Sequence, residues 1–427
     1  MQQLISFLIA SISFLPLASL LLFNVIGGDF FSTKFLLLKD VVIFLLLLIY
    51  AAYLIQQFTI KIKYKYIVIL IFVYFVCLVF NAIVFYSSLA EIVLNMRRAA
   101  MHLIVFLLFI FVPLSSRNIN AAHKTIVLVS WAVCLFGFVE YILPDSFWND
   151  FLNIAEYWST NKFDPWAAES IFYSGRFYSW DLFLITGEKE RRMVSTYLEP
   201  TTLSAFLSFA FIYLNYGQTN KSVYVKILIS MIFICGILTL SKGFLLSFIS
   251  AWLLFRIKLH PYAVIILSLL VFYLAAAFLA SYGITKGAFS HVNGYYTAVN
   301  YLLDGNLFGK GLGSAGNYGN LADKHEGIGE AVGGESGLGN MLAQTGVAAL
   351  LFVIIIGAIC SELVKINSHI SRSLNLAMMA WFLTFIYSAS SLGISGNVYV
   401  FIFSGIYLSH FKIRRKANKY YALEWAK

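Results

Sequence analysis

Apolar residues fill long continuous stretches of the chain, and short polar segments separate these stretches. They do not alternate apolar with polar positions, as the strands of a membrane barrel would. In lipid, only helices and closed barrels satisfy every backbone hydrogen bond, and a helix crosses a bilayer with about 20 apolar residues. The pattern therefore predicts about 12 transmembrane helices, at about 4–26, 35–55, 66–86, 99–114, 123–143, 194–216, 224–240, 243–258, 262–282, 336–361, 374–392 and 396–412.

Composition excludes a soluble fold. Of the 427 residues, 60% are hydrophobic and 12% are charged, whereas soluble domains carry roughly 25% charged residues. We therefore expect an all-α polytopic integral membrane protein with a single membrane domain, residues 1–427. The first stretch has no charged segment before it and no small-residue cleavage site, so we expect a retained helix. The four cysteines fall in different apolar stretches, which favours small buried residues over disulfides.

Basic residues in the short loops predict the orientation. With the N-terminus inside, every short inner loop and the C-terminal tail hold at least two basic residues, as the positive-inside rule requires. Both termini are then cytoplasmic, and two long loops, at about 144–193 and 283–335, lie on the outer side. The net charge of +10 follows from this topology. No basic patch accompanies a soluble fold, so we expect no nucleic-acid partner.

A layer of charged residues is predicted near the outer ends of the helices. Charges within a membrane are costly and mark functional sites, whereas transporters place their sites near the midplane. The basic members either reach toward lipid phosphates or, as a group, bind pyrophosphate. The layer contains Arg97, Arg98, Glu140, Arg191, Arg192, Glu199 and Lys242.

The two predicted outer loops have distinct compositions. The first holds four of the eight tryptophans, whose faces suit either sugar rings or an interfacial aromatic belt: Trp148, Trp158, Trp166 and Trp180. The second is rich in glycine, which either exposes amides to phosphate or forms a turn-rich lid. It contains no Gly-x-x-x-x-Gly-Lys-[Ser/Thr] phosphate loop, and no Asp-x-Asp occurs anywhere in the chain. We therefore expect neither a metal nor a cofactor.

Four segments resemble the bacterial O-antigen polymerases and O-antigen ligases. RRMVSTYLEPTTLSAFL (191–207) is similar to an Arg-led segment of that family that opens a helix, and LTLSKGFLLSFI (238–249) to its Ser-Arg-Gly helix start. YYTAVNYLLDGNLFGKGLGS (295–314) resembles its aromatic helix with a Gly-x-Gly turn, and GESGLGNMLAQTGVAALL (334–351) its last motif. The chain departs from the family at SHVNGYY, which lacks the usual arginine, and at Glu335, where ligases have histidine. These departures favour a polymerase.

The resemblance implies transfer of a growing glycan from undecaprenyl pyrophosphate to a hydroxyl of a lipid-linked repeat, at the outer face of a bacterial inner membrane. Membrane lipid and a chain-length regulator are further candidate partners. The leaving pyrophosphate requires positive charge, for which the candidates are Arg98, Arg191, Arg192 and Lys242. The hydroxyl requires a base, for which the candidates, in decreasing order, are Glu335 and Glu199, then His325, then Glu140.

Three alternatives remain open at the level of sequence. A ligase would transfer the glycan to lipid A core, and the acceptor that is used would distinguish it. A flippase or transporter is disfavoured by the outer charge layer, the long outer loops and the lack of internal repeats. A glycosyltransferase that uses a polyprenyl-phosphate sugar would employ an acidic residue of the short outer segment between the first two predicted spans, here Asp29.

Overall fold

The computed structural model describes residues 2–26, 64–85, 89–111, 114–161, 172–173, 176–179, 182–183, 186–188, 190–257, 259–283, 290–313 and 332–424. Within these ranges the chain is almost entirely helical, apart from one short antiparallel strand pair, β1 (Phe172–Tyr173) and β2 (Arg176–Phe177). The chain divides into two compact units. Unit 1 is Met1–Ile60 with Leu114–Leu245, and unit 2 is Lys61–Pro113 with Leu246–Lys427.

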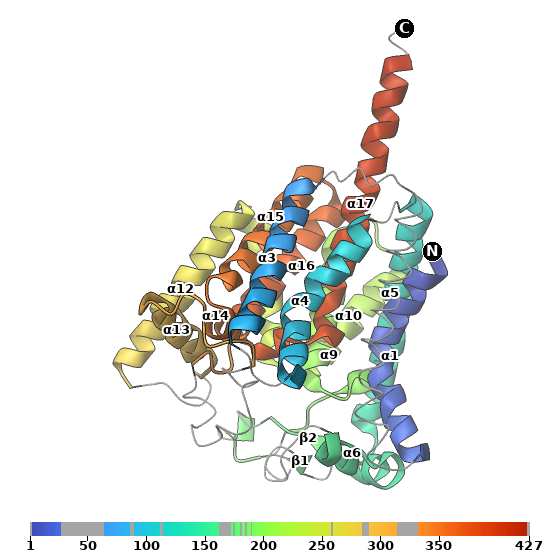
Figure 1. Cartoon of the computed structure of the whole chain (residues 1–427). Helices are drawn as coiled ribbons and strands as arrows, with labels where there is room; N and C mark the ends of the chain where they lie inside the picture. The colour runs from blue at the N-terminus through green and yellow to red at the C-terminus, as the bar shows by residue number, and fades with distance from the viewer. Residues whose placement is uncertain are drawn as a thin grey trace. The chain divides into compact units, whose positions relative to one another are not determined.

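Unit 1 is built around two long helices. Helix α1 (Gln2–Ile26) lies beside α5 (Ser116–Ile142) and contacts the short helix α6 (Figure 1). The other elements of this unit are η1 (Phe147–Phe151), α6 (Ile154–Asn161), η2 (Ser195–Tyr197), α9 (Pro200–Gly217), α10 (Val223–Leu238) and the start of α11 (Lys242–Ile257). Helix α9 packs against α10, and η2 packs against α1 and α5.

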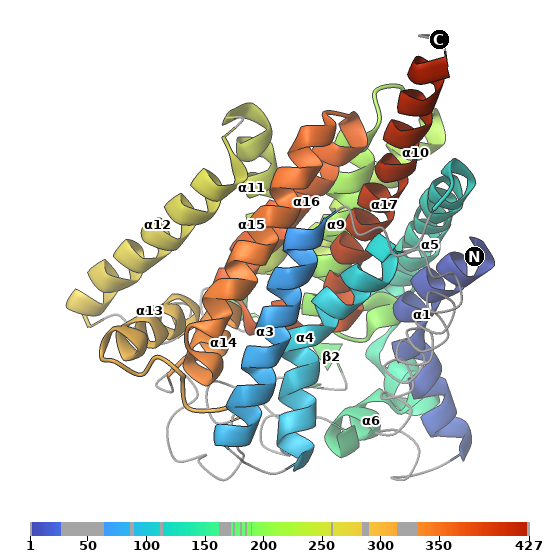
Figure 2. The same ribbon diagram turned by 45° about the horizontal axis from the view of Figure 1, so that its top comes forward.

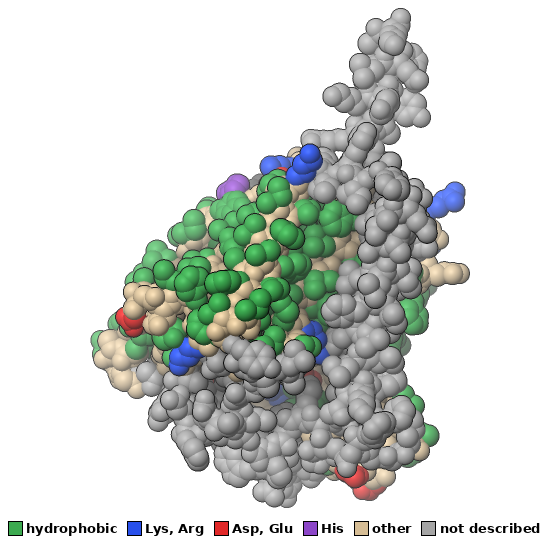
Figure 3. All heavy atoms as spheres, viewed as in Figure 1, with side chains coloured by type: hydrophobic (Ala, Val, Ile, Leu, Met, Phe, Trp, Pro, Cys, Tyr) green, Lys and Arg blue, Asp and Glu red, His purple; other side chains and the backbone are tan. Residues whose placement is uncertain are grey.

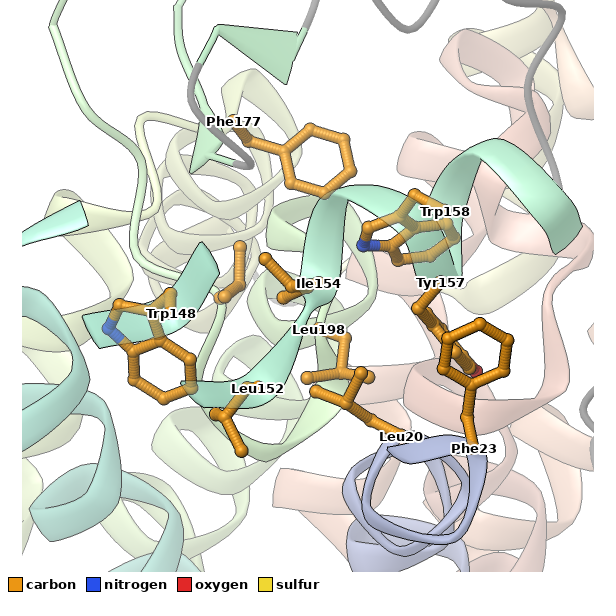
Figure 4. Close-up of a cluster of buried hydrophobic side chains, with 10 residues drawn as sticks. Leu20, Phe23, Trp148, Leu152, Ile154, Tyr157, Trp158, Phe177 and Leu198 are labelled. Carbon is orange, nitrogen blue, oxygen red and sulfur yellow. The ribbon is translucent and has the colours of Figure 1, made fainter. Parts of the chain in front are cut away.

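The aromatic residues of the first predicted loop form a core in unit 1. Trp148 and Trp158 are only 2% and 3% exposed and pack with Leu20 and Phe23 of α1 and with neighbouring apolar side chains (Figure 4). Burying large aromatic side chains of this kind stabilises the fold by about 2 kcal/mol each. The interpretation of these two tryptophans as a surface for sugar rings is therefore wrong. Trp166 and Trp180 lie outside the described residues.

Unit 2 packs most of its helices around α15 and α16. Helix α3 contacts α4 and α15, α13 contacts α12 and α14, and α17 packs along α4 (Figure 2). Its elements are α3 (Lys65–Val84), α4 (Leu89–Phe111), α12 (Pro261–Ser281), α13 (Ser290–Leu303), α14 (Gly337–Thr345), α15 (Ala348–Ile366), α16 (His369–Tyr387), η5 (Ala389–Leu392) and α17 (Ile394–Glu424).

Six helices in the described part of the chain are long and apolar enough to cross a membrane, and they indicate a membrane-embedded protein. They lie in α1, α3, α5, α12, α15 and α17. On unit 2, hydrophobic side chains cover the face formed by α3, α12 and α15 (Figure 3). Phe72 of α3 and Phe278 of α12 are 67% and 62% exposed there, as lipid-facing side chains are. The predicted span 35–55 lies outside the described residues.

Helix α4 begins ten residues before the predicted start at residue 99. The added turns, LAEIVLNM (89–96), contain good helix formers, but their polar residues lower the hydropathy below that of a span. Arg97 and Arg98 therefore lie inside α4, and the prediction that they begin a helix is wrong.

The predicted single span 336–361 is two helices, because the chain breaks at Gly346 between α14 and α15. Gly346 has φ +58° and ψ −130°, a conformation that residues with a Cβ rarely adopt. A Cβ at this position would also lie 1.9 Å from the Leu307 carbonyl oxygen. Residues 336–361 contain no charged residue, and the stretch is apolar before Gln344 and after Gly346, which is why hydropathy alone predicted one continuous helix.

The glycine-rich turn at 309–313 satisfies the backbone at this break. Its amides donate to the carbonyls of Ala343 and Gln344 at 2.8 and 3.0 Å, and to the side-chain oxygens of Asn81 and Gln344 at 3.1 and 3.2 Å. A helix break inside a protein requires such partners, because an unpaired buried carbonyl costs about 1–3 kcal/mol. The expectation that this turn offers its amides to a phosphate is therefore wrong for residues 310–313.

Candidate functional site

Arg191 holds the C-terminal end of α5. Its guanidinium donates from Nη2 to the Glu140 carbonyl at 2.6 Å and from Nη1 to the Leu143 carbonyl at 3.0 Å. Helix C-termini carry unpaired carbonyls and partial negative charge, so an arginine is favourable there. Burial lowers the pKa of Arg191, while Asp145, 3.5 Å away, and Tyr141 oppose that shift. With its side chain only 18% exposed, Arg191 is largely occupied by this role.

Glu140, in the last turn of α5, faces the Arg191 guanidinium with its carboxylate. Its side chain is fully buried, with Oε1 3.6 Å from the Arg191 guanidinium. Oε2 accepts hydrogen bonds from the amides of Val194 and Ser195, at 3.1 and 3.3 Å. The carboxylate thus ties the segment that follows Arg191 to α5. These contacts explain the buried charge of Glu140 as a structural one.

Arg192 donates to a carbonyl at the C-terminal end of α10, as Arg191 does at the C-terminal end of α5. Its Nε donates to the carbonyl of Thr239, the C-cap of α10, at 2.9 Å, and the Met193 amide donates to the carbonyl of Leu238, the last residue of α10, at 2.9 Å. Arg191 pairs with Tyr178 in an antiparallel bridge, so the backbone is extended and successive side chains point to opposite sides. The two adjacent arginines therefore serve two different helix ends.

Glu199 and Lys242 lie at the starts of two helices, near the segment that carries Arg191 and Arg192. Glu199 is the N-cap of α9, and its carboxylate accepts from the hydroxyls of Thr201 and Thr202 at 3.1 and 2.7 Å. Lys242 begins α11 after a tight turn, as the sequence predicts. Ser204 of α9 bonds to Ser241 at 2.9 Å and thereby joins the two helix starts.

Unit 1 therefore brings three candidate residues into one neighbourhood. Arg192 holds the Thr239 carbonyl, three residues before Lys242, while the Ser204–Ser241 bond connects that same turn to the helix that Glu199 opens. The start of α9, the end of α10 and the start of α11 meet there. Lys242 and the N-terminal amides of α11 can bind an anion there, with Arg192 as a further cation.

The backbone of this neighbourhood contains unusual conformations. Ser195 and Leu198, in the turn before Glu199, have φ of 47° and 58°, and Leu240, in the turn before Lys242, has φ of 47°. A left-handed conformation costs a non-glycine residue roughly 1 kcal/mol or more and concentrates at functional sites. Only two other non-glycine residues in the described ranges have positive φ, so the strain gathers around these turns.

In unit 2, Glu335 forms a pair with a residue that the sequence analysis missed. Its Oε2 lies 3.0 Å from Nε2 of His291, and the two side chains are 30% and 22% exposed. Glu335 precedes Ser336, which is the N-cap of α14 and accepts from the Gly339 amide at 2.9 Å. Ser336, and not Glu335, therefore caps α14. The segment SHVNGYY, noted for its lack of arginine, contains this histidine and was the available signal.

The remaining candidates lie elsewhere. Arg98 lies inside α4 of unit 2 and donates from Nη1 to Asn95 Oδ1 at 3.5 Å. His325 and Asp29 lie outside the described residues. Among the described residues, no group of three or more His, Cys, Asp or Glu side chains could hold a metal ion. The four cysteines are free, and Cys134, Cys235 and Cys360 are buried.

No protein-family model matches the chain, and no curated protein matches it.

Proposed function

We propose that this protein is a polymerase of lipid-linked glycans, with about 12 transmembrane helices in a bacterial inner membrane and an active site at the outer face. The four sequence segments similar to O-antigen polymerases support this function. The observation that carries it furthest is the neighbourhood of Arg192, Glu199 and Lys242 in unit 1, where three helix ends meet. Those residues belong to two of the similar segments.

In the proposed reaction, a sugar hydroxyl of a new lipid-linked repeat attacks the anomeric carbon of the growing glycan. The new carbon–oxygen bond forms as the bond to undecaprenyl pyrophosphate breaks, and the pyrophosphate leaves with the electron pair. The hydroxyl proton passes to a carboxylate, for which Glu335 of unit 2 is the first candidate and Glu199 of unit 1 the second. The leaving pyrophosphate requires positive charge, for which Arg192 and Lys242 of unit 1 are the candidates. No oxidation or reduction occurs.

Lys242 supports an anion-binding role through its position. A cation at the first residue of a helix opposes the helix dipole, which costs about 0.3–1 kcal/mol. With a pyrophosphate bound, the lysine and the helix N-terminus act in the same direction. Arg191 remains a candidate for pyrophosphate, but its contacts with α5 predict that much of its effect arises through folding.

We predict that Arg192→Ala and Lys242→Ala each shorten the glycan strongly, while the protein still inserts. Lys242→Arg should be partly tolerated, because it keeps the charge. Gel analysis of the polymer, with immunoblots of membrane fractions, measures both quantities. Arg256→Ala, at the other end of α11, is the matched control and should leave the chain length unchanged. Glycan of normal length from the Arg191→Ala, Arg192→Ala double variant would rule out the proposed pyrophosphate role.

The topology gives a second prediction. Cysteine labelling from outside the cell should modify single cysteines introduced near residues 165 and 320. It should not modify those near residues 63, 257 and 418, because the inner loops and the tail carry the basic residues. Labelling of residue 165 only after the cells are permeabilised would invert the proposed orientation, and with it the location of the active site.

The break between α14 and α15 is the feature that most favours a transporter, because transporters bind ions on broken helices. Here, however, the carbonyls of Ala343 and Gln344 already accept from the 309–313 turn. They are therefore engaged within the protein, and we retain the polymerase. An assay that offers lipid-linked repeats and lipid A core side by side would separate a polymerase from a ligase.

A further inference from the structure

Three elements of unit 2 hold the His291–Glu335 pair. Helix α13 carries His291 in its first turn, the segment that enters α14 carries Glu335, and α16 ends at Tyr387. The His291 and Tyr387 rings stack, with centroids 4.6 Å apart and planes at 29°. The Ala389 amide donates to the Glu335 carbonyl at 2.6 Å. Both the backbone and the carboxylate of Glu335 are thus fixed by neighbours.

A glycine contact brings α13 close enough for this pair to form. A Cβ on Gly294 would lie 2.5 Å from the Gly333 carbonyl oxygen and 2.9 Å from the Gly334 Cα, so only glycine permits the approach. Gly294 follows His291 by about one helical turn and lies on the same face of α13. The close packing of α13 against residues 333–334, which requires Gly294, therefore also places the His291 imidazole beside Glu335.

We propose that His291 is a positioning residue for the Glu335 carboxylate, an inference that rests on the proposed polymerase function. In the tautomer with its proton on Nε2, His291 donates to Oε2 and orients the carboxylate. A carboxylate has two oxygens and accepts several hydrogen bonds. The hydroxyl proton passes to Glu335 as the oxygen bonds to the anomeric carbon and the pyrophosphate departs.

The test compares His291→Ala, His291→Gln, Glu335→Gln and the His291→Ala, Glu335→Gln double variant. Full-length protein in proteoliposomes is supplied with an undecaprenyl-pyrophosphate-linked repeat, and kcat and KM are measured. We expect His291→Ala to lower kcat about 100-fold, the cost of a misplaced catalytic group, with little change in KM. Glutamine retains a donor near the Nε2 position, so His291→Gln should recover most of that loss. His369→Ala, an exposed histidine of the same unit, should match the wild type.

The outcomes are distinct. If the pair acts as one unit, His291→Ala causes no further loss in the Glu335→Gln background. A wild-type kcat for His291→Ala overturns the proposal, and so does a folded His291→Gln variant as slow as Glu335→Gln. If wild-type protein lengthens no glycan, the polymerase function fails by itself. The His291–Glu335 hydrogen bond is then tested separately by NMR. The ¹⁵N chemical shift of His291 Nε2 must change in Glu335→Gln if the bond exists.

Discussion

Glutamine in place of Glu335 is expected to stop polymerisation, so that single lipid-linked repeats accumulate instead of polymer. Glutamine keeps the shape of the side chain and much of its hydrogen bonding, but it cannot accept the hydroxyl proton. General-base catalysis contributes about 10²- to 10⁴-fold, so the rate should fall by that factor. The variant should fold and insert normally, because Ser336 rather than Glu335 caps α14.

Asp304→Asn is the matched control, because it likewise replaces a carboxylate by its amide, at an exposed residue that directly follows α13 in the same unit. Its polymer should have wild-type length. Glu199→Gln is expected to have a smaller effect, since that carboxylate already accepts from two threonine hydroxyls at the start of α9. If both glutamine variants polymerise normally, neither carboxylate is the base, and His325 becomes the next candidate.

The largest effect on stability is expected from Glu140→Ala. The change leaves the Val194 and Ser195 amides without their acceptor and removes the carboxylate that faces the Arg191 guanidinium. A buried amide left without its acceptor costs about 1–3 kcal/mol, so we expect a loss of that order, while Asp145 continues to face the Arg191 guanidinium.

Thermal unfolding of the purified protein in detergent measures this effect, with tryptophan fluorescence as the signal. Trp148 reports locally, because its Nε1 donates to the Glu140 carbonyl at 3.3 Å. Glu156→Ala, at an exposed position of α6 in the same unit, is the control and should change the unfolding temperature little. Equal unfolding temperatures for the two variants would show that the Glu140 contacts contribute no stability.

The helices were predictable, because a continuous apolar stretch must pair its backbone internally wherever lipid surrounds it. The break at Gly346 was not predictable, since no charged residue interrupts the stretch and only the positive φ of Gly346 and its distant partner, the 309–313 turn, reveal it. The start of α4 was missed because helix propensity continues where hydropathy falls.

The candidate site was predictable in its residue types and less so in their roles. Paired arginines suggest phosphate binding. However, Arg191 donates to carbonyls 48 and 51 residues away, and only the fold reveals these acceptors. The His291–Glu335 pair likewise depends on the packing of α13 against α14, which no local pattern encodes. The predicted span 194–216 begins six residues before α9, because residues 195–197 form the separate element η2 and Pro200 opens the helix.

The turn that closes the break between α14 and α15 also bears on the order of synthesis. Residues 309–313 leave the ribosome before Ala343 and Gln344, so the amides exist before the carbonyls that need them. When α14 and α15 emerge from the ribosome, the 309–313 turn that pairs with the carbonyls at their break is therefore already present. A circular permutant that begins between this turn and α14 would reverse that order. In this permutant the carbonyls of Ala343 and Gln344 would be synthesised first and would stay unpaired until residues 309–313 followed. The finished protein would still contain every contact of the native fold.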